Sequence, residues 1–262
     1  MFIDSHCHLD RIDLAPYQND FSQFVEQARQ SQIDHMLCIA IDLEAWPAMR
    51  DQVAPFTDIS LSVGVHPNVT EGREPSVEEL VDLAAGEKVI AIGETGLDYF
   101  RSSGDLDWQH QRFKHHIQAA IQTQKPLIIH TREAGQDSLD VLEQEHAEQV
   151  GGIIHCFTED WDYAKRALDL GFYISFSGIV TFKNAKQVQE VARKVPANRF
   201  LIETDSPYLA PVPHRGKPNY PLYVSYVAEC LATLRDTSVE EIARQSSENF
   251  YRLFPTAKES LI

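Results

Sequence analysis

Short apolar runs recur at regular intervals along this chain, and each is followed by a longer stretch with helical periodicity. Several runs are almost wholly apolar and rich in β-branched residues, which is typical of parallel strands covered on both faces. Eight strand–helix units in 262 residues predict an α/β fold closed into a (β/α)₈ TIM barrel. The predicted strands are Met1 to Asp4, His35 to Ile41, Ile59 to Val65, Val89 to Gly93, Pro126 to Ile129, Gly152 to Cys156, Phe172 to Ser177 and Arg199 to Glu203.

An open, doubly wound sheet is the alternative arrangement of the same units. It requires a glycine-rich phosphate turn after an early strand, and the sequence contains no G-x-G-x-x-G motif. No linker or solenoid repeat marks a second unit, so residues 1–262 are predicted to form one domain. A helix is expected after Ser76, with Glu79 in capping-box position. The other predicted helices are Tyr17 to Ser31, Asp107 to Thr123, Asp160 to Leu170, Leu222 to Leu234 and Ser238 to Phe254.

The charge of the chain limits the partners that it can bind. A net charge of −16 at pH 7 counts against tight, non-specific binding to long nucleic-acid duplexes. It leaves room for an enzyme that takes one phosphodiester at a time, because bound metal ions supply positive charge locally. The four cysteines lie far apart, as buried thiols in a reducing compartment do. With no secretory pattern and no long apolar run, we expect a cytoplasmic, monomeric protein without membrane or obligate protein partners.

Potential metal ligands follow six of the predicted strands directly. The carboxyl ends of barrel strands form the rim where TIM-barrel enzymes build their active sites. In His6-x-His8 both imidazoles point to the same side of an extended strand, so both can reach one ion. Imidazoles and carboxylates together suit zinc or manganese, whereas magnesium is less suited to histidine ligands. The residues at this rim are His6, His8, His66, Glu94, His130, His155 and Asp205.

Each of these residues has a structural interpretation when taken alone. A histidine after a strand is usually a satisfied loop residue, and Asp205 is suited to cap the following helix. Their convergence at one end of six predicted strands favours a metal site over coincidence. Histidines within predicted helices, such as His116, are interpreted as surface or packing residues.

A compact basic loop follows the eighth predicted strand. It runs from His214 through Arg215 and Lys217 in an otherwise acidic chain, and it offers a place for a phosphate group. Arg132, just beyond His130, is a second candidate for phosphate binding. The competing interpretation is a solvated loop whose arginine pairs with a nearby acid.

The residues at the rim resemble the motifs of the TatD-type metal-dependent deoxyribonucleases. The resemblance runs essentially from end to end, and its segments occur in the order of the family. They are Phe2 to Asp10, Gly64 to Pro67, Gly93 to Tyr99, Pro126 to Ala134, Ile154 to Phe157, Glu203 to Pro207 and His214 to Asn219.

The resemblance implies a TIM barrel with two divalent metal ions per chain, whether zinc, manganese or magnesium. By position, His6, His8, Glu94 and Asp205 would hold one ion, and Glu94, His130 and His155 the other, with Glu94 shared. It also implies nuclease activity, in several members a 3′→5′ exonuclease activity on single-stranded DNA. The substrate is therefore expected to be a single-stranded DNA end or a small phosphate ester.

A hydrolytic mechanism fits these residues as a hypothesis. Asp205 would accept a proton from the attacking water, and His66, with Arg132 or Lys217, would stabilise charge on the phosphoryl oxygens. Glu203 would support the ligands from the barrel interior. Two alternatives stay open: an amidohydrolase-like enzyme acting on a small lactone, amide or phosphate ester, and a non-catalytic scaffold that uses metal for stability only.

Overall fold

All eight strands of the protein are parallel and lie in one sheet in the order β1 to β8, as a TIM barrel requires. The computed structural model describes residues 1–259. The predicted fold class is confirmed. The strands are β1 (Phe2–Cys7), β2 (Ile33–Cys38), β3 (Ile59–Val63), β4 (Val89–Asp98), β5 (Leu127–Arg132), β6 (Gly152–Ile154), β7 (Phe172–Phe176) and β8 (Phe200–Ile202).

The first and last strands meet just beyond their carboxyl ends. Cys7 and Ser206 form a parallel bridge. The His8 N–H group donates to the Ser206 carbonyl at 2.8 Å, and the Asp205 N–H group donates to the His6 carbonyl at 2.9 Å. These contacts close the sheet into a nearly complete barrel, and they bring Asp205 beside the two histidines of the H-x-H motif.

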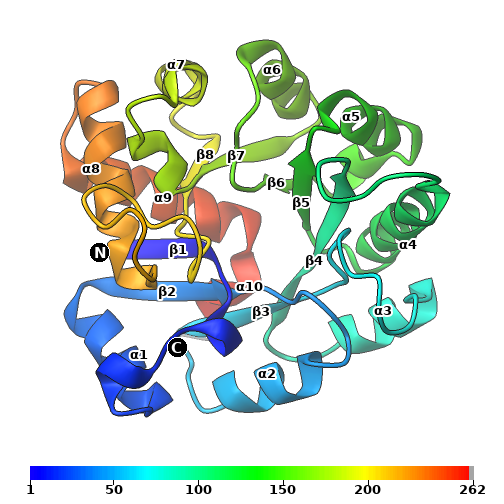
Figure 1. Ribbon diagram of the computed structural model, residues 1–262, viewed down its shortest axis with the longest axis horizontal. Coiled ribbons are helices and arrows are strands. Elements are labelled where there is room, and N and C mark those ends of the chain that lie inside the picture. The colour runs from blue at the N-terminus through cyan, green and yellow to red at the C-terminus, as the bar shows by residue number, and fades with distance from the viewer. Residues whose placement is uncertain (260–262) are drawn as a thin grey trace.

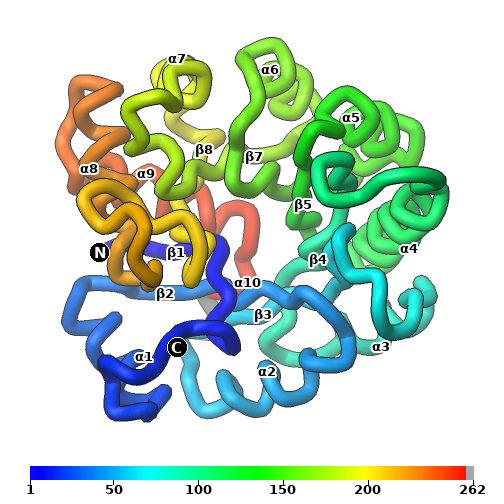
Figure 2. The backbone as a smooth tube through the Cα atoms, in the orientation of Figure 1, coloured from blue at the N-terminus to red at the C-terminus, as the bar shows by residue number. Residues whose placement is uncertain are grey.

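Helices surround the strands, and the chain winds once around the barrel (Figures 1 and 2). The last two helices, coloured red in Figure 1, pack against one end of the barrel. The helices are α1 (Phe21–Gln30), α2 (Trp46–Val53), α3 (Val77–Ala84), α4 (Asp107–Thr123), α5 (Gly135–Gln144), α6 (Trp161–Asp169), α7 (Lys186–Lys194), α8 (Val224–Leu234), α9 (Val239–Leu253) and α10 (Pro255–Glu259), with 3₁₀ turns at η1 (Leu9–Arg11), η2 (Ala15–Tyr17), η3 (Ala147–Gln149), η4 (Gly178–Thr181) and η5 (Pro221–Tyr223).

Two apolar clusters correspond to the two faces of the sheet. The larger lies between the strands and the outer helices. The smaller contains Ile3, Leu37, Ile128 and Leu201 together with Phe250 of α9, and it fills the barrel interior towards its N-terminal end. Because both faces of each strand are buried, the strands read as continuous apolar runs rather than alternating ones.

Several element boundaries differ from the sequence-based prediction. β1, β4 and β5 run three to five residues further than predicted. β1 pairs with β2 as far as Cys7, and β4 pairs with β5 as far as Asp98 and Arg132. His6, Glu94 and His130 therefore lie within strands, not after them. Helix α1 begins at Phe21 instead of Tyr17, because Asp20 caps it by accepting hydrogen bonds from Ser22 and Gln23.

The predicted capping residue Ser76 does cap a helix, and Ser238 caps another. The Ser76 hydroxyl accepts the Glu79 N–H group at 3.1 Å at the start of α3, and Ser238 accepts the Glu241 N–H group at 3.2 Å at the start of α9. Each bond satisfies one of the free N–H groups of a first helical turn. Within residues 1–259, no helix combines the length and the apolar character needed to cross a bilayer.

Candidate metal centre

Glu94 on β4 is buried at the C-terminal rim among the predicted histidines. Its Oε2 atom lies 3.3 Å from His6 Nε2 and 3.8 Å from His8 Nε2. The same two nitrogens lie 3.6 and 3.3 Å from Asp205 Oδ1. Both imidazoles of the H-x-H motif thus point to one place between two carboxylates, as strand alternation predicts.

The other oxygen of Glu94 faces a second set of imidazoles. Oε1 lies 2.8 Å from His155 Nε2, 3.0 Å from His130 Nδ1 and 3.4 Å from His66 Nε2. The rings of His6 and His155 stack with their centroids 3.9 Å apart, which joins the two sets. Glu94 therefore offers one carboxylate oxygen to each set of imidazoles.

The residues present fit a divalent-metal centre. Both ring nitrogens of His6 and of His155 are buried without a hydrogen-bond partner in the described part of the chain. Leaving such atoms unpartnered costs free energy, and coordination to a cation removes that cost. Ligand atoms come within 4.8 Å of one another in three groups: His6, His8 and Asp205; His66, Glu94 and His130; and His6, His155 and Glu203.

The surrounding imidazoles keep both carboxylates ionised. Burial raises the pKa of Glu94, but the charges of His155, His66 and His6 outweigh burial and hold the pKa well below its usual value. Burial also raises the pKa of Asp205, and a hydrogen bond from His8 with the nearby imidazoles lowers it further than burial raises it. Both groups are thus negative at neutral pH, as metal ligands must be.

The hydrogen bonds made by Nδ1 of His8 and of His66 show which of the two rings can bind a metal through Nε2 and which can donate a hydrogen bond from it. His8 Nδ1 lies 3.1 Å from the Ile39 carbonyl, to which it can only donate, so Nε2 keeps a lone pair for a metal. His66 Nδ1 accepts the Asn68 N–H group at 3.0 Å, so a neutral His66 carries its proton on Nε2. Burial lowers the pKa of His66 to about 4, which keeps the ring neutral. His66 is thus suited to donate a hydrogen bond into the site rather than to bind a metal.

Helix α4 fixes the end of β3 beside His66. The buried His116 accepts the Val65 N–H group through Nε2 at 2.9 Å, and Arg112 Nη1 donates to the His66 carbonyl at 2.8 Å. His116 is therefore a packing residue, as predicted, and it holds the backbone next to the site.

Asp98 is a buried site residue to which the sequence analysis assigned no role. Its Oδ2 atom lies 3.0 Å from His130 Nε2 and accepts a hydrogen bond from Asn68 Nδ2 at 2.8 Å. Burial raises the pKa of Asp98, but bonds from His130, the Arg101 N–H group and Asn68 hold it well below its usual value. The carboxylate therefore directs His130 Nδ1 towards Glu94. Asp98 lies four residues beyond Glu94 on one strand, so alternation along β4 was the signal that could have found it.

Glu203 lies behind His155 instead of at the opening of the site. Its Oε1 atom accepts the Cys156 N–H group at 2.7 Å and lies 3.4 Å from His155 Nδ1. The side chain is fully buried. This position suits the supporting role predicted for Glu203.

Two glycines allow β4 and β5 to approach closely around Glu94. Gly93 has a φ of +141°, and a Cβ atom there would lie 2.6 Å from the Ile128 carbonyl oxygen. Gly96 has a φ of +139°, and its Cβ would lie 2.0 Å from the His130 carbonyl oxygen. Side chains at these positions would push apart the strands that carry Glu94 and His130.

A cavity of about 680 Å³ opens at the histidine cluster. Three arginines line it, Arg11, Arg101 and Arg132, of which only Arg132 was predicted. Arg11 lies within ion-pair distance of Asp10 and Asp42. The predicted ligands and catalytic residues that line the cavity are His8, His66, Glu94, His130, His155 and Asp205.

The basic loop after β8 is not among the residues lining this cavity. His214 stacks on Tyr223 with the ring centroids 4.1 Å apart, and the Arg215 guanidinium lies 4.3 Å from the Phe182 ring. Lys217 is exposed. The phosphate-binding role of His214, Arg215 and Lys217 stays a prediction, whereas the structure brings Arg132 to the cavity.

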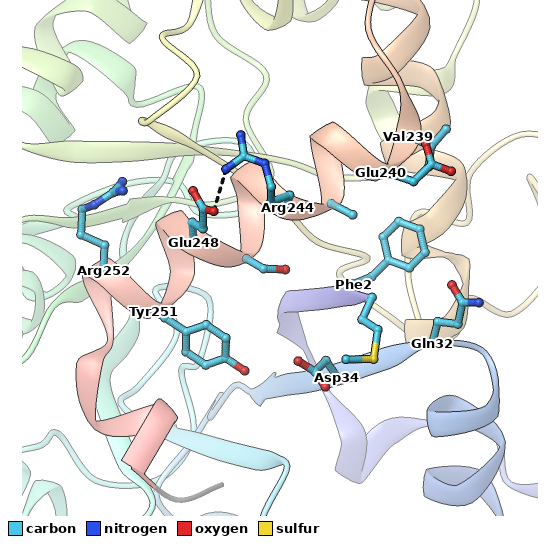
Figure 3. Close-up of a pocket in the computed structure, with 12 residues that line it drawn as sticks. Phe2, Gln32, Asp34, Val239, Glu240, Arg244, Glu248, Tyr251 and Arg252 are labelled. Carbon is cyan, nitrogen blue, oxygen red and sulfur yellow. Dashed lines mark hydrogen bonds and ion pairs between the residues drawn. The ribbon is translucent and has the colours of Figure 1, made fainter. Parts of the chain in front are cut away.

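A second cavity, of about 610 Å³, lies at the opposite end of the barrel (Figure 3). It is bounded by the N-terminal ends of β1 and β2 and by helix α9, with Asp34 on one side and Arg244 on the other. Arg244 pairs with Glu248 at 2.6 Å on its own helix. None of the described residues that line this cavity is a histidine or a cysteine.

Comparison with known proteins gives consistent similarities. The family model described as TatD related DNase matches residues 3–255. The metal-dependent hydrolase YcfH of Escherichia coli K12 is 48% identical over 252 residues, covering 96% of this chain and 95% of YcfH. The metal-dependent hydrolase TatD of Mycobacterium tuberculosis is 34% identical over 96% of this chain and 97% of its own length.

Solved structures agree with the sequence relatives. The crystal structure of YjjV, a TatD homologue from Escherichia coli K12, has a TM-score of 0.88 at 27% identity and covers 97% of this chain and 98% of that one. An organophosphorus hydrolase variant from Deinococcus radiodurans has a TM-score of 0.68 at 15% identity, covering 97% of this chain and 92% of its own. The latter likeness shows a shared fold.

Proposed function

The chain belongs to the TatD family of metal-dependent hydrolases, and from this premise we propose that it hydrolyses phosphodiester bonds at the ends of single-stranded DNA, in the 3′→5′ direction. We further propose that two divalent ions act together, zinc or manganese before magnesium, held by His6, His8 and Asp205 on one side and by His130 and His155 on the other, with Glu94 shared.

The division of Glu94 between two imidazole sets carries this proposal. Oε2 faces His6 at 3.3 Å, and Oε1 faces His155 at 2.8 Å. When bound, paired ions lower the pKa of a water molecule and neutralise charge on the phosphoryl oxygens of an ester. A single structural zinc would be expected to close with four ligands, whereas this cluster offers more and opens to a cavity.

The remaining roles fall to side chains that line the cavity. Asp205, held ionised by its neighbours, accepts the proton released as water attacks phosphorus. His66 donates its Nε2 hydrogen to a phosphoryl oxygen, since Nδ1 is occupied by the Asn68 N–H group. Arg132 binds a non-bridging oxygen of the same or the next phosphate.

The test is degradation of single-stranded DNA labelled at the 3′ end or at the 5′ end, with magnesium, manganese or zinc. The expected result is immediate release of the 3′ label and stepwise shortening of the 5′-labelled strand. The His130→Ala variant should show neither. If the wild-type protein has bound ions and leaves DNA intact with every metal, the proposal fails, and small phosphate esters, lactones and amides become the substrates to assay.

A further inference from the structure

Two large aromatic rings at the C-terminal rim are exposed to solvent. Phe100 is 54% exposed and Tyr208 is 47% exposed. Phe100 follows β4 and Tyr208 follows β8, and these strands are four places apart in a ring of eight. The two rings therefore stand on opposite sides of the barrel mouth, with Glu94 and its histidines between them.

Tyr208 is held firmly despite its exposure. Its N–H group donates to the Asp205 carbonyl at 2.9 Å, and its own carbonyl accepts from the amide of the buried Asn219 at 2.5 Å. Its ring lines the cavity, with its centroid 5.9 Å from that of His8. An exposed aromatic ring on a hydrogen-bonded backbone segment beside the site offers a flat apolar face, and ordering a tyrosine side chain costs little conformational entropy.

Positive charge accompanies the aromatic rings on the other side of the mouth. The Arg132 guanidinium lies 3.9 Å from the Phe100 ring centroid. In the described part of the chain, neither Arg132 nor Arg101 has a carboxylate within 4.0 Å, although Arg11 has two. In a protein of net charge −16, unpaired arginines beside an exposed aromatic ring suit a ligand with anionic groups and planar rings.

The cavity continues sideways past Arg101. This arginine also lines a neighbouring cavity of about 470 Å³, together with Ser102, Ser103 and Trp108. The Trp108 ring is partly exposed and carries the Arg112 guanidinium 4.8 Å from its centroid. Like the main cavity, this second cavity combines an arginine with hydroxyl groups and an aromatic ring. The two cavities together have room for a ligand longer than one phosphate ester.

We propose that Tyr208 and Phe100 stack against the two unpaired bases that flank the scissile phosphate of a single-stranded nucleic acid, and that the strand continues past Arg101 into the cavity beside Trp108. This inference rests on the proposed function. It requires substrate bases that are free to stack, so a strand is recognised by its bases as well as its phosphates. Stacking accepts any base, which gives affinity without sequence preference.

Binding of two matched probes tests the stacking directly. The probes are a five-residue thymidylate and a five-residue abasic chain, both with phosphorothioate linkages that resist cleavage, bound to the metal-loaded protein. Since stacking of one base contributes about five- to hundredfold in affinity, wild-type protein should bind the thymidylate at least fivefold more tightly. Tyr208→Ala and Phe100→Ala should each reduce this ratio, whereas Tyr208→Phe should keep it, and Arg244→Ala at the opposite end serves as a control.

The outcomes separate this inference from the proposed function. Equal affinity of wild-type protein for both probes, or an unchanged ratio in Tyr208→Ala, overturns the stacking. Cleavage of ordinary phosphodiester versions of both chains is measured in parallel. Equal cleavage rates with equal affinities would leave the nuclease proposal intact while the stacking positions fail; intact DNA in every reaction would overturn the nuclease proposal instead.

Probe length tests the path past Arg101. Arg101→Ala should weaken binding of the five-residue thymidylate by a clearly larger factor than binding of a two-residue thymidylate, because Arg101 lines both cavities and the short probe reaches only the first. An equal effect on both lengths would overturn this path. Trp108→Ala is expected to follow the same length dependence.

Discussion

The two ends of the barrel both contain buried histidine, yet only one end has the arrangement of a reactive site. Near the N-terminal end, His35 is fully buried, bonds to the Ser60 hydroxyl at 2.9 Å and packs against Phe250. At the C-terminal rim, buried imidazoles surround the carboxylates of Glu94 and Asp205. Burial of a histidine therefore says little by itself, whereas several imidazoles aimed at shared carboxylate oxygens indicate a cation site.

The cavities at the two ends differ in the same way. At the N-terminal cavity, Arg244 on helix α9 pairs with Glu248 (Figure 3). It also pairs with Glu241 on the same helix. Charges at the C-terminal cavity are left available, since Arg101 and Arg132 have no carboxylate partner in the described part of the chain. The arginine that faces the N-terminal cavity from α9 is thus already paired with carboxylates, whereas two arginines at the C-terminal cavity can meet an anionic ligand.

Glu94→Gln should have the largest effect, because it removes the charge shared by both imidazole sets. Metal ions contribute several kcal/mol to such hydrolysis, so activity should fall on the order of 10³-fold. Hydrolysis rates with saturating manganese, beside metal content per chain, measure the loss. Retention of most activity by Glu94→Gln would show that the two sets do not depend on this carboxylate.

Asp98→Asn should have the next largest effect, because Asp98 orients His130 without reaching the cation itself. Removing such a supporting charge typically lowers metal affinity or activity by about 10- to 100-fold. Metal titration followed by calorimetry gives the affinity. Asp58→Asn is the matched control, since Asp58 is a buried aspartate paired with Arg29 away from the rim, and it should cost stability but leave metal affinity unchanged. Equal metal affinity in the two variants would contradict the role of Asp98.

The pH dependence of stability should identify His35 as a neutral packing residue. Burial lowers the pKa of His35 to about 4, below the usual 6.5, so the unfolded chain binds the proton first as pH falls. Stability is therefore full above pH 6.5 and is lost progressively between 6.5 and 4, by about 2 kcal/mol at pH 5. Urea unfolding of chelator-treated protein at pH 7 and pH 5 should show a smaller difference in His35→Gln than in wild type. The same pH difference in both proteins would be inconsistent with a neutral His35.

Arg244→Ala should have the smallest effect. Its pairs on α9 are exposed, and exposed ion pairs on a helix contribute little to stability. Thermal unfolding and hydrolysis should therefore be close to wild type. A large loss of hydrolysis in this variant would mean that the N-terminal cavity takes part in the reaction.

The sequence predicted the ring of strands and the rim because both depend on local periodicity. Burial on both faces makes each strand an apolar run, and Glu94, His130 and His155 all occur near strand ends. The role of Asp98 was missed because β4 was expected to end at Gly93, so the alternation that aligns Asp98 with Glu94 was not applied. The position of a loop depends instead on contacts between distant segments, and stacking of His214 on Tyr223 could not be predicted from the pattern around it.

The number of divalent ions bound per chain decides whether Glu94 is shared by two metal sites. Native mass spectrometry of wild-type protein with manganese or zinc should detect two ions at saturation, and Glu94→Gln should fail to hold both. Arg244→Ala, at the other end of the barrel, should bind two ions as wild type does. Two ions on wild-type protein and on Arg244→Ala, with fewer than two on Glu94→Gln, would establish a shared carboxylate at the C-terminal rim. No more than one ion on wild-type protein, or two ions on Glu94→Gln, would contradict it.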